Sequence, residues 1–524
     1  MSSENINNNN INNNMENNIN NKEIPNDNII QEKPNNDSST PVKDYIPQNY
    51  NHNSIFDKYK ENYDDSDGGE SELDNKGTEN YKSAGVQIAN TIMGAGILSI
   101  PIVFRYLGIL LGTTFIVFIA FVTMYSVYLL IRCHQISGKN SYSMFAKITI
   151  GNFGPLFVKI VIIINNFGLC CAYFRIFGET VQTLFAAFVD SSSYLVTNWH
   201  NYLYILLIGL IMSKFIFKQN ISSFKHVAFL GITSVSIFTV SLVTLFCFKK
   251  YNNLIDNKIT KDYWFPNCTL LEAFQSMPTV FLAFTFQFNV FPIYFSLQNR
   301  NLFTMISATK LGVSFCLFIF LVTGLFGFLL FGFDMNNTIL QELFDDMVKY
   351  KEISLFIKYL IILTSISFII SCLTSFPVMF FSLKENLLNS FAFCGKNCCN
   401  DSENEQNVNN NNDNKNEVQV IERVNKDEPL NRDYFAPITK KIIVVVLYLC
   451  IIVITILIPK LKIIFHIVGS TSGNFIAFIF PNLFYIKLVK MTNGKQNLIL
   501  PAFLLIVGLI FLGISLVISI IKQD

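Results

Sequence analysis

Long apolar runs separated by short polar segments dominate the chain after residue 80. A helix needs about 20 apolar residues to cross about 30 Å of hydrocarbon. By this measure the pattern predicts an all-α polytopic membrane protein with eleven transmembrane helices, over residues 83–104, 110–131, 155–189, 202–217, 227–248, 273–298, 311–333, 359–383, 442–458, 463–486 and 498–521.

Two polar segments interrupt this pattern. Residues 1–80 are Asn-rich and acidic, and we expect a disordered cytosolic tail because such a segment buries too little apolar surface to fold. Residues 384–440 are similarly polar and predict a disordered cytosolic loop. The expected organisation is therefore a tail, transmembrane helices 1–8 over residues 81–383, this loop, and transmembrane helices 9–11 over residues 441–524.

The composition agrees with this membrane assignment. Hydrophobic residues make up 51% of the chain and charged residues only 15%, against about 25% charged residues in soluble domains. A large soluble enzyme is therefore excluded. The net charge of +2 without a clustered basic face gives no case for nucleic-acid binding. The sequence carries no phosphate-binding loop, nucleophile elbow or metal-ligand cluster, so we expect neither an enzyme nor a cofactor.

Charge and sequons give an orientation. With the amino terminus in the cytosol, Lys and Arg are moderately enriched in the inner loops, as the positive-inside rule requires. The sequons at Asn267 and Asn336 then fall in outer loops and are predicted to be glycosylated, whereas those at Asn220 and Asn400 fall inside. The plasma membrane and an endolysosomal or vacuolar membrane are both compatible with this topology.

The first span is interrupted by Gly94, Gly96 and Pro101. Freed backbone groups in a bilayer must find partners, so a broken helix is tolerated beside a cavity or other protein. The amides of the half-helix that follows such a break suit a carboxylate, and the freed carbonyls suit a small cation. Close helix packing through small residues explains the two glycines equally well.

The sixth span contains a second interruption, with Gln287 and Asn289 before Pro292. Its distance of five spans from the first break is that expected of two inverted repeats, in which paired broken helices mark a midplane site. An ordinary proline kink is the alternative.

The eighth span carries hydroxyl groups at helical spacing, and these share one face: Ser367, Ser371, Thr374 and Ser375. They are candidates for ligating a cation together with carbonyls of the first span. Hydroxyls that bond back to the preceding turn are the alternative.

Ionisable residues inside spans are costly and often functional. Arg175 and Glu179 lie four residues apart in the third span, and we expect a structural or gating ion pair. His466 in the tenth span is either a packed, hydrogen-bonded histidine or a proton carrier.

Four stretches now resemble one known family. Residues 90–101, NTIMGAGILSIP, resemble the first helix of the amino acid/auxin permease superfamily, which includes the sodium-coupled neutral amino acid transporters. Residues 173–179 (YFRIFGE), 290–294 (VFPIY) and 375–377 (SFP) are similar to stretches of its third, sixth and eighth helices. The resemblance covers roughly residues 80–521.

The resemblance implies a 5+5 inverted-repeat, LeuT-like transporter fold plus one extra helix. It implies substrate binding at Thr91, Gly94, Ala95, Gly96, Phe284 and Thr285, with the Gly94–Gly96 amides on the substrate carboxylate. It implies a sodium site at Asn90, the Met93 carbonyl, Ser371, Thr374 and Ser375. The sequence departs from many relatives at two positions: Gln287 stands where they have His, and Arg175 where they have an apolar residue. Cys247 and Cys268 flank a loop where some relatives have a disulfide.

The function we expect is secondary active transport of small neutral amino acids, coupled to sodium or to protons. The neutral oxygens of the implied cation site favour sodium, since a proton would need a titratable group. The alternatives are an amino acid sensor that binds without net flux, and a channel or structural membrane protein. The expected partners are an amino acid and the lipid bilayer, and the oligomeric state is open.

Overall fold

The computed structural model describes residues 77–188, 201–215, 225–254, 263–265, 268–335, 337–349, 354–404, 437–458, 461–493 and 496–521. Within these ranges the regular elements are helices, and one parallel bridge joins Glu79 to Leu297. Eight described helices are long and apolar enough to cross a membrane, and two shorter helices, Tyr202–Met212 and Ile499–Ser515, are also apolar. The all-helical polytopic architecture is therefore confirmed. Residues 1–76, Asn267 and Asn336 lie outside the described ranges.

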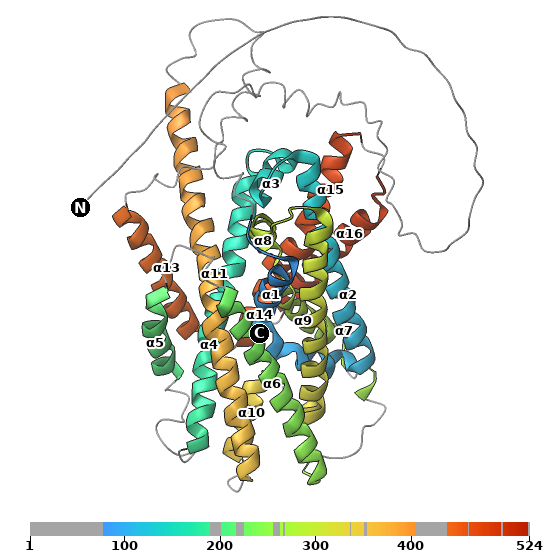
Figure 1. Ribbon diagram of the computed structural model, residues 1–524, viewed down its shortest axis with the longest axis vertical. Coiled ribbons are helices and arrows are strands. Elements are labelled where there is room, and N and C mark those ends of the chain that lie inside the picture. The colour runs from blue at the N-terminus through green and yellow to red at the C-terminus, as the bar shows by residue number, and fades with distance from the viewer. Residues whose placement is uncertain are drawn as a thin grey trace, which may run out of the picture. The chain divides into compact units, whose positions relative to one another are not determined.

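The helices begin and end close to the expected spans (Figure 1). They are α1 (Tyr81–Ile92), α2 (Ile100–Ser137), α4 (Gly154–Phe188), α5 (Asn201–Met212), α6 (Lys225–Tyr251), α7 (Leu270–Ala283), α8 (Val290–Ser296), α9 (Leu302–Phe331), α11 (Leu355–Asn404), α13 (Pro437–Leu457), α14 (Leu461–Val468), α15 (Phe480–Met491) and α16 (Ile499–Ile521). Helix α2 covers the end of the first expected span and all of the second. It changes direction at Gly108, whose φ of 71° favours glycine.

Two short helices lie between the expected spans: α3 (Tyr142–Ile150) and α10 (Ile339–Lys349). Both are too short to cross a membrane. Helix α3 begins after Ser141, whose hydroxyl accepts a hydrogen bond from the Met144 amide at 3.2 Å. Helix α10 buries only one face, through Ile339, Leu340 and Leu343. A search for long apolar runs does not detect such elements.

The expected loop over residues 384–440 requires a correction, because α11 continues from the eighth span to Asn404. The first turns of this extension pack against α4, where the Lys159 Nζ donates to the Asn389 carbonyl at 3.1 Å. Lys384 and Ser390 are buried there. Polar content alone predicted a loop, but tertiary contacts stabilise a helix. Residues 405–436 lie outside the described part of the chain.

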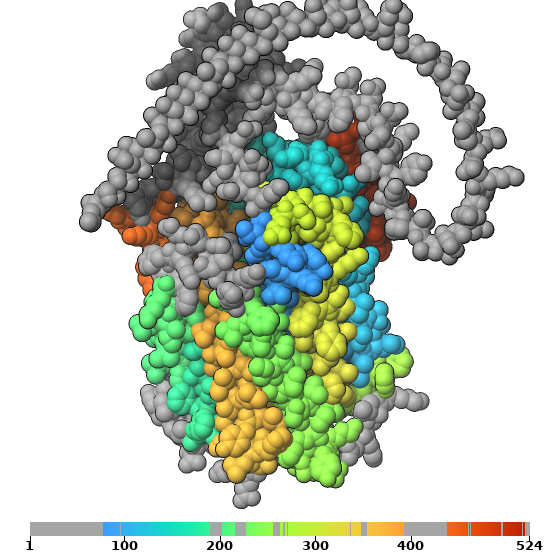
Figure 2. All heavy atoms as spheres, viewed as in Figure 1, coloured from blue at the N-terminus to red at the C-terminus, as the bar shows by residue number. Residues whose placement is uncertain are grey.

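The two broken helices lie against the long ones. Helix α1 packs on α6 and α9, while α11 packs on α4 and α6. On the face in Figure 2, the atoms of α1 (blue) border those of α8 and the start of α9 (yellow-green). Large apolar side chains stay exposed along the outer helices, among them Leu110, Phe121, Leu210, Phe229 and Val240. Such a surface is typical of a protein that faces lipid.

Candidate functional site

The first helix break lies between α1 and the 3₁₀ helix η2 (Ala95–Ser99), which leads directly into α2. The Met93 amide still donates to Ala89 at 2.8 Å, and the Gly94 amide donates to Ile92 at 2.7 Å. No side chain caps the start of η2. The first amides of a helix have no intrahelical acceptor, so the amides of Ala95 and Gly96 stand at an uncapped helix start.

The two glycines of this break have different surroundings. A Cβ atom on Gly94 would lie 2.2 Å from the Tyr173 hydroxyl oxygen, which reaches the break from α4. A Cβ atom on Gly96 would lie 2.6 Å from the Ala283 Cβ and 2.7 Å from its Cα, at the end of α7. Gly94 therefore leaves room for a polar group, whereas Gly96 permits the two broken helices to touch.

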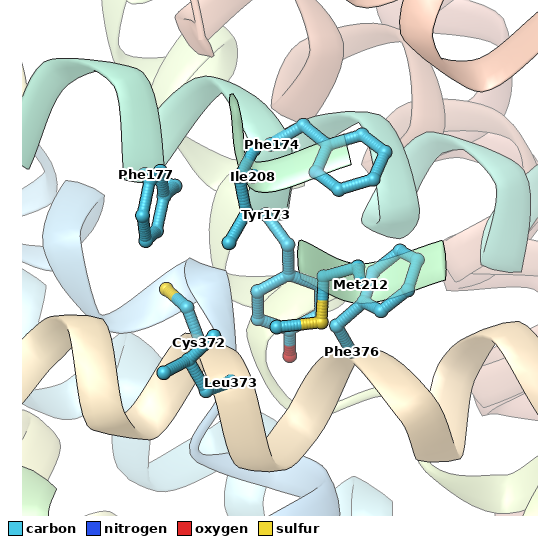
Figure 3. Close-up of a pocket in the computed structure, with 8 residues that line it drawn as sticks. All are labelled: Tyr173, Phe174, Phe177, Ile208, Met212, Cys372, Leu373 and Phe376. Atoms are coloured by element: carbon cyan, nitrogen blue, oxygen red, sulfur yellow. The ribbon is translucent and has the colours of Figure 1, made fainter. Parts of the chain in front are cut away.

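Tyr173 was not among the substrate-binding residues expected from the sequence. Its hydroxyl lies in an otherwise apolar part of α4, and a polar tip on a buried aromatic ring is the signal that could have identified it. Tyr173 also lines a small cavity between α4, α5 and α11 (Figure 3), together with Phe174, Phe177, Ile208, Met212, Cys372, Leu373 and Phe376. The rest of this lining is apolar apart from two sulfur atoms. Tyr173 therefore connects an apolar cavity with the first break, which its hydroxyl reaches at Gly94.

The second break follows α7 and contains the 3₁₀ helix η7 (Gln287–Asn289) before α8. The side chain of Gln287 is fully buried. Its Oε1 accepts a hydrogen bond from the Phe286 amide at 2.9 Å, and its Nε2 donates to the Ser126 hydroxyl of α2 at 3.1 Å. At the second break, the Gln287 side chain therefore provides a hydrogen-bond partner for a freed backbone amide.

Three expected substrate-facing side chains already have partners. The Thr91 hydroxyl donates to the Gln87 carbonyl at 2.9 Å, and the Thr285 hydroxyl donates to Phe281 at 2.6 Å. Phe284 is fully buried, with its ring centroid 5.0 Å from that of Phe320 on α9. Gly96 brings Phe284 and Thr285 close to the first break through its contact with Ala283. The side chain of Ala95 lies outside the part of the chain that the structure describes.

Two of the expected cation ligands, Asn90 of α1 and Thr374 of α11, lie close to one another. Asn90 on α1 and Ser371, Thr374 and Ser375 on α11 are all buried. A Cβ atom on Gly231 of α6 would lie 2.2 Å from the Asn90 Oδ1 and 2.6 Å from the Thr374 Oγ1. The Thr374 hydroxyl donates to the Ser371 carbonyl at 2.8 Å, and the buried Ser375 hydroxyl has no hydrogen-bond partner within the described part of the chain. Oxygen atoms from α1 and α11 thus converge beside α6.

Ser367 carries the fourth hydroxyl of that helix face, and this hydroxyl bonds within α11. Ser367 bonds back to the Leu363 carbonyl at 2.7 Å, as membrane helices commonly do. Among the described residues no group of His, Cys, Asp and Glu side chains has the arrangement of a metal site. The candidate cation site therefore consists of neutral oxygen atoms.

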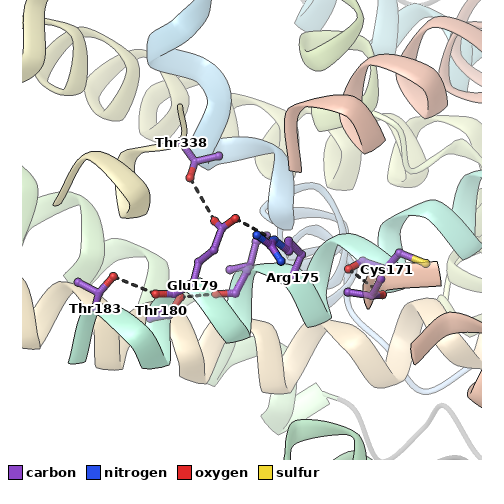
Figure 4. Close-up of polar contacts among 8 residues, drawn as sticks. Cys171, Arg175, Glu179, Thr180, Thr183 and Thr338 are labelled. Carbon is purple, nitrogen blue, oxygen red and sulfur yellow. Dashed lines mark hydrogen bonds and ion pairs between the residues drawn. The ribbon is translucent and has the colours of Figure 1, made fainter. Parts of the chain in front are cut away.

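Arg175 and Glu179 form an ion pair on α4, with 3.2 Å between the Arg175 Nε and the Glu179 Oε1 (Figure 4). Both side chains are buried. The second carboxylate oxygen accepts a hydrogen bond from Thr338, which precedes α10, at 3.4 Å. Thr183 of α4 donates to the Leu340 carbonyl at 3.4 Å. The pair therefore joins α4 to α10.

Helix α10 and Met335, which precedes it, are also attached to two other helices. The Arg105 guanidinium of α2 donates to the Met335 carbonyl at 2.5 Å. The Lys249 ammonium at the end of α6 contacts the Asp346 carboxylate at 2.5 Å. Because α10 also contacts η2, these attachments hold a short helix next to the first break.

The remaining candidates lie apart from this cluster of contacts. Cys247 and Cys268 are both free thiols, so the disulfide of some relatives is not formed. The Cys268 thiol donates to the Tyr106 carbonyl at 2.8 Å. Burial, with a smaller contribution from the charge of Glu272, raises the pKa of Cys268 and favours the protonated thiol. His466 is half-buried on α14, which packs on α4 and α7.

Comparison with known proteins identifies the family of this chain. Residues 77–523 match the family described as transmembrane amino acid transporter protein. The chain belongs to this family. The resemblance to the amino acid/auxin permeases is therefore confirmed, and the protein is an integral membrane transporter rather than an enzyme.

Individual relatives are distant but align over most of the chain. It is 24% identical to the amino acid transporter AVT6E of Arabidopsis thaliana over 427 residues, which cover 80% of this chain and 78% of the relative. It is 22% identical to the sodium-coupled neutral amino acid symporter 2 of Danio rerio, covering 80% and 78%. Among solved structures, MhsT in complex with L-phenylalanine aligns with 84% of this chain and 97% of its own, at 10% identity and a TM-score of 0.48.

Proposed function

We propose that this family member is a secondary active transporter of small neutral amino acids, coupled to sodium, with its amino terminus in the cytosol. In this proposal eleven spans form a 5+5 inverted repeat plus one helix. The first repeat runs from α1 to α6 and the second from α7 to α15, with α3 and α10 as connecting helices and α16 as the extra span. Alternating access then rocks one bundle against the other around a midplane site.

The observation that carries the proposal is the meeting of two broken helices beside α4. The uncapped start of η2 presents the Ala95 and Gly96 amides, and the positive end of a half-helix suits a carboxylate. The Tyr173 hydroxyl lies at the same place. The residues of the two breaks themselves, 93–99 and 284–289, are uncharged, and Gly96 and Ala283 are in close contact. These features support a small substrate with a neutral side chain.

The oxygen atoms beside Gly231 support sodium as the coupling ion. Asn90 and Thr374 contribute neutral oxygens that remain ligands at any physiological pH. A coupling proton needs a titratable group, and Gln287 supplies none where many relatives have His. The names of relatives such as the sodium-coupled symporter of Danio rerio point the same way.

Reconstitution of the full chain into proteoliposomes tests the proposal. Uptake of a panel of radiolabelled amino acids is measured under an inward sodium gradient, under choline at fixed pH, and under an imposed acid gradient. We expect saturable uptake and counterflow of small neutral amino acids that require sodium. Full uptake without sodium and strong stimulation by external acid would establish proton coupling instead. Binding without flux would identify a sensor, and non-saturable flux a channel.

A further inference from the structure

Gly231 occupies an unusual position on α6. It is the one glycine in this helix of 27 residues. Glycine in a helix interior costs about 1 kcal/mol relative to alanine, so its presence calls for a local reason. Its φ lies outside the left-handed region, so backbone conformation does not require it. The reason must lie in what a side chain at this position would meet.

The neighbours of Gly231 differ from those of other described helical glycines. A Cβ atom on Gly168 would meet Val468, and one on Gly209 would meet Ile452, so those glycines permit apolar helix packing. The two nearest atoms to a Cβ on Gly231 are side-chain oxygens from two other helices, the Asn90 Oδ1 and the Thr374 Oγ1. Only a hydrogen-bond donor or a cation gains from two converging oxygen acceptors.

The next residue of α11 gives a second observation. The hydroxyl of Ser375, the residue after Thr374 on α11, is fully buried and has no hydrogen-bond partner among the described residues. An unpaired buried hydroxyl typically costs about 1–3 kcal/mol. The local structure therefore combines converging oxygens, an orphaned hydroxyl and a missing side chain.

We infer that α6 forms the third wall of the cation site and that Gly231 is its specificity-determining residue. This inference rests on the proposed sodium coupling. The absence of a side chain leaves the Asn90 and Thr374 oxygens the space against the α6 backbone, where a small monovalent cation held by both oxygens would also touch α6. The close approach of the Gly231 backbone limits how large that cation can be. A methyl group at this position fills the same space and displaces both oxygens.

The test is sodium-dependent thermal stability of the purified full chain, which does not require transport. A ligand that binds the native state stabilises it by an amount that grows with the logarithm of its concentration relative to its Kd, and so raises the unfolding temperature. Wild type and Gly231→Ala are titrated with sodium chloride against choline chloride. We expect Gly231→Ala to weaken the apparent sodium affinity by at least about tenfold, with an unfolding temperature in choline close to that of wild type. Gly513→Ala on α16 is the matched control, since a Cβ there meets no atom within 4 Å.

Ion size provides a second measurement on the unmodified protein, which remains decisive if Gly231→Ala does not fold. We expect sodium and lithium to stabilise wild type and potassium and rubidium to do so much less. Equal stabilisation by all four ions would contradict a size limit set by α6. Wild-type sodium affinity in Gly231→Ala would show that Gly231 is not a wall of the site. If wild type itself does not respond to sodium, the proposed coupling ion is wrong and the inference about Gly231 falls with it.

Discussion

The two helix breaks differ in how the interrupted backbone is satisfied. At the second break, Gln287 accepts the Phe286 amide and ties the break to α2 through Ser126. At the first break no side chain caps η2, and the glycines keep the surrounding space small and polar. Freed backbone groups in hydrocarbon must have partners. Neither η2 nor η7 has a side-chain cap, so the two breaks differ in the hydrogen bonds of Gln287. Under the proposed function the first break binds the ligand, and the second is a structural hinge.

This difference has a consequence for mutations. Changes at the first break should act on ligand affinity and turnover with little effect on folding. Changes at the second break should act on stability with little effect on affinity. Mutations at each break therefore separate effects on ligand affinity from effects on stability.

Gly94→Val should abolish transport. The new side chain meets the Tyr173 hydroxyl, since even its Cβ would lie 2.2 Å from that oxygen, and it fills the space beside the η2 amides. We expect uptake to fall by at least about 100-fold, because misplacement by about 1 Å at a binding site is enough for such a loss. Uptake is normalised to the amount of folded protein in the membrane. If this variant bound the substrate with wild-type affinity, the substrate carboxylate would not bind at the first break. Gly96→Val is unsuitable as a companion, because its Cβ would clash with the backbone of α7.

Glu179→Gln should destabilise the contact between α4 and α10, which lies next to the first break. Removing one member of a buried ion pair typically costs about 3–5 kcal/mol, because the other charge stays buried without compensation. The expected results are a lower unfolding temperature and impaired uptake. A charge swap, Arg175→Glu with Glu179→Arg, should recover part of both.

The pair between Lys249 and Asp346 is the matched control for this prediction. It attaches the same helix α10, but its side chains are 13% and 20% exposed. The Arg175 and Glu179 side chains are 11% and 7% exposed. The Lys249 pair is thus intermediate between exposed pairs, which contribute about 0–1 kcal/mol, and buried ones, so Lys249→Gln should change the unfolding temperature less. Equal effects of Glu179→Gln and Lys249→Gln would show that burial of the α4 pair has no energetic importance.

Both breaks were predictable from the sequence, but their different roles were not. Glycine, proline and amide residues inside apolar runs are local signals, so Gly94 and Gln287 could be identified without a structure. The roles of Tyr173 and Gly231 depend on which helices meet, and no local pattern encodes that. The same reason explains why α10 was missed, since its stability comes from contacts with other helices rather than from its own apolar length.

Gln287→Ala examines the second break. Loss of the side chain leaves the Phe286 amide and the Ser126 hydroxyl without these partners in a buried region. Leaving a buried polar group unsatisfied costs about 1–3 kcal/mol. We expect a lower unfolding temperature and fewer folded molecules, while the remaining molecules keep the wild-type KM for their substrate. A clear rise in KM would show that the second break also contacts the substrate, and the proposed division between the two breaks would be wrong.

The smallest effect is expected at Glu79, where the segment before α1 meets the end of α8. Its carboxylate accepts hydrogen bonds from Gln87 of α1 at 2.6 Å and from Ser296 of α8 at 3.5 Å. Its backbone amide also donates to the Ser296 carbonyl at 3.0 Å, so the side chain supplies only part of the attachment. A single hydrogen bond contributes about 1 kcal/mol net, and that amount changes an opening equilibrium about fivefold.

We therefore expect Glu79→Gln to increase the transient exposure of the neighbouring Leu297, which is fully buried. The measurement is the alkylation rate of Leu297→Cys, compared with and without Glu79→Gln in the same background. A severalfold faster reaction, with an unfolding temperature near that of the single variant, would show that Glu79 holds α1 and α8 together. An unchanged rate would mean that the backbone bridge is sufficient. The two breaks would then be coupled through the contact of Gly96 with Ala283 and not through the Glu79 side chain.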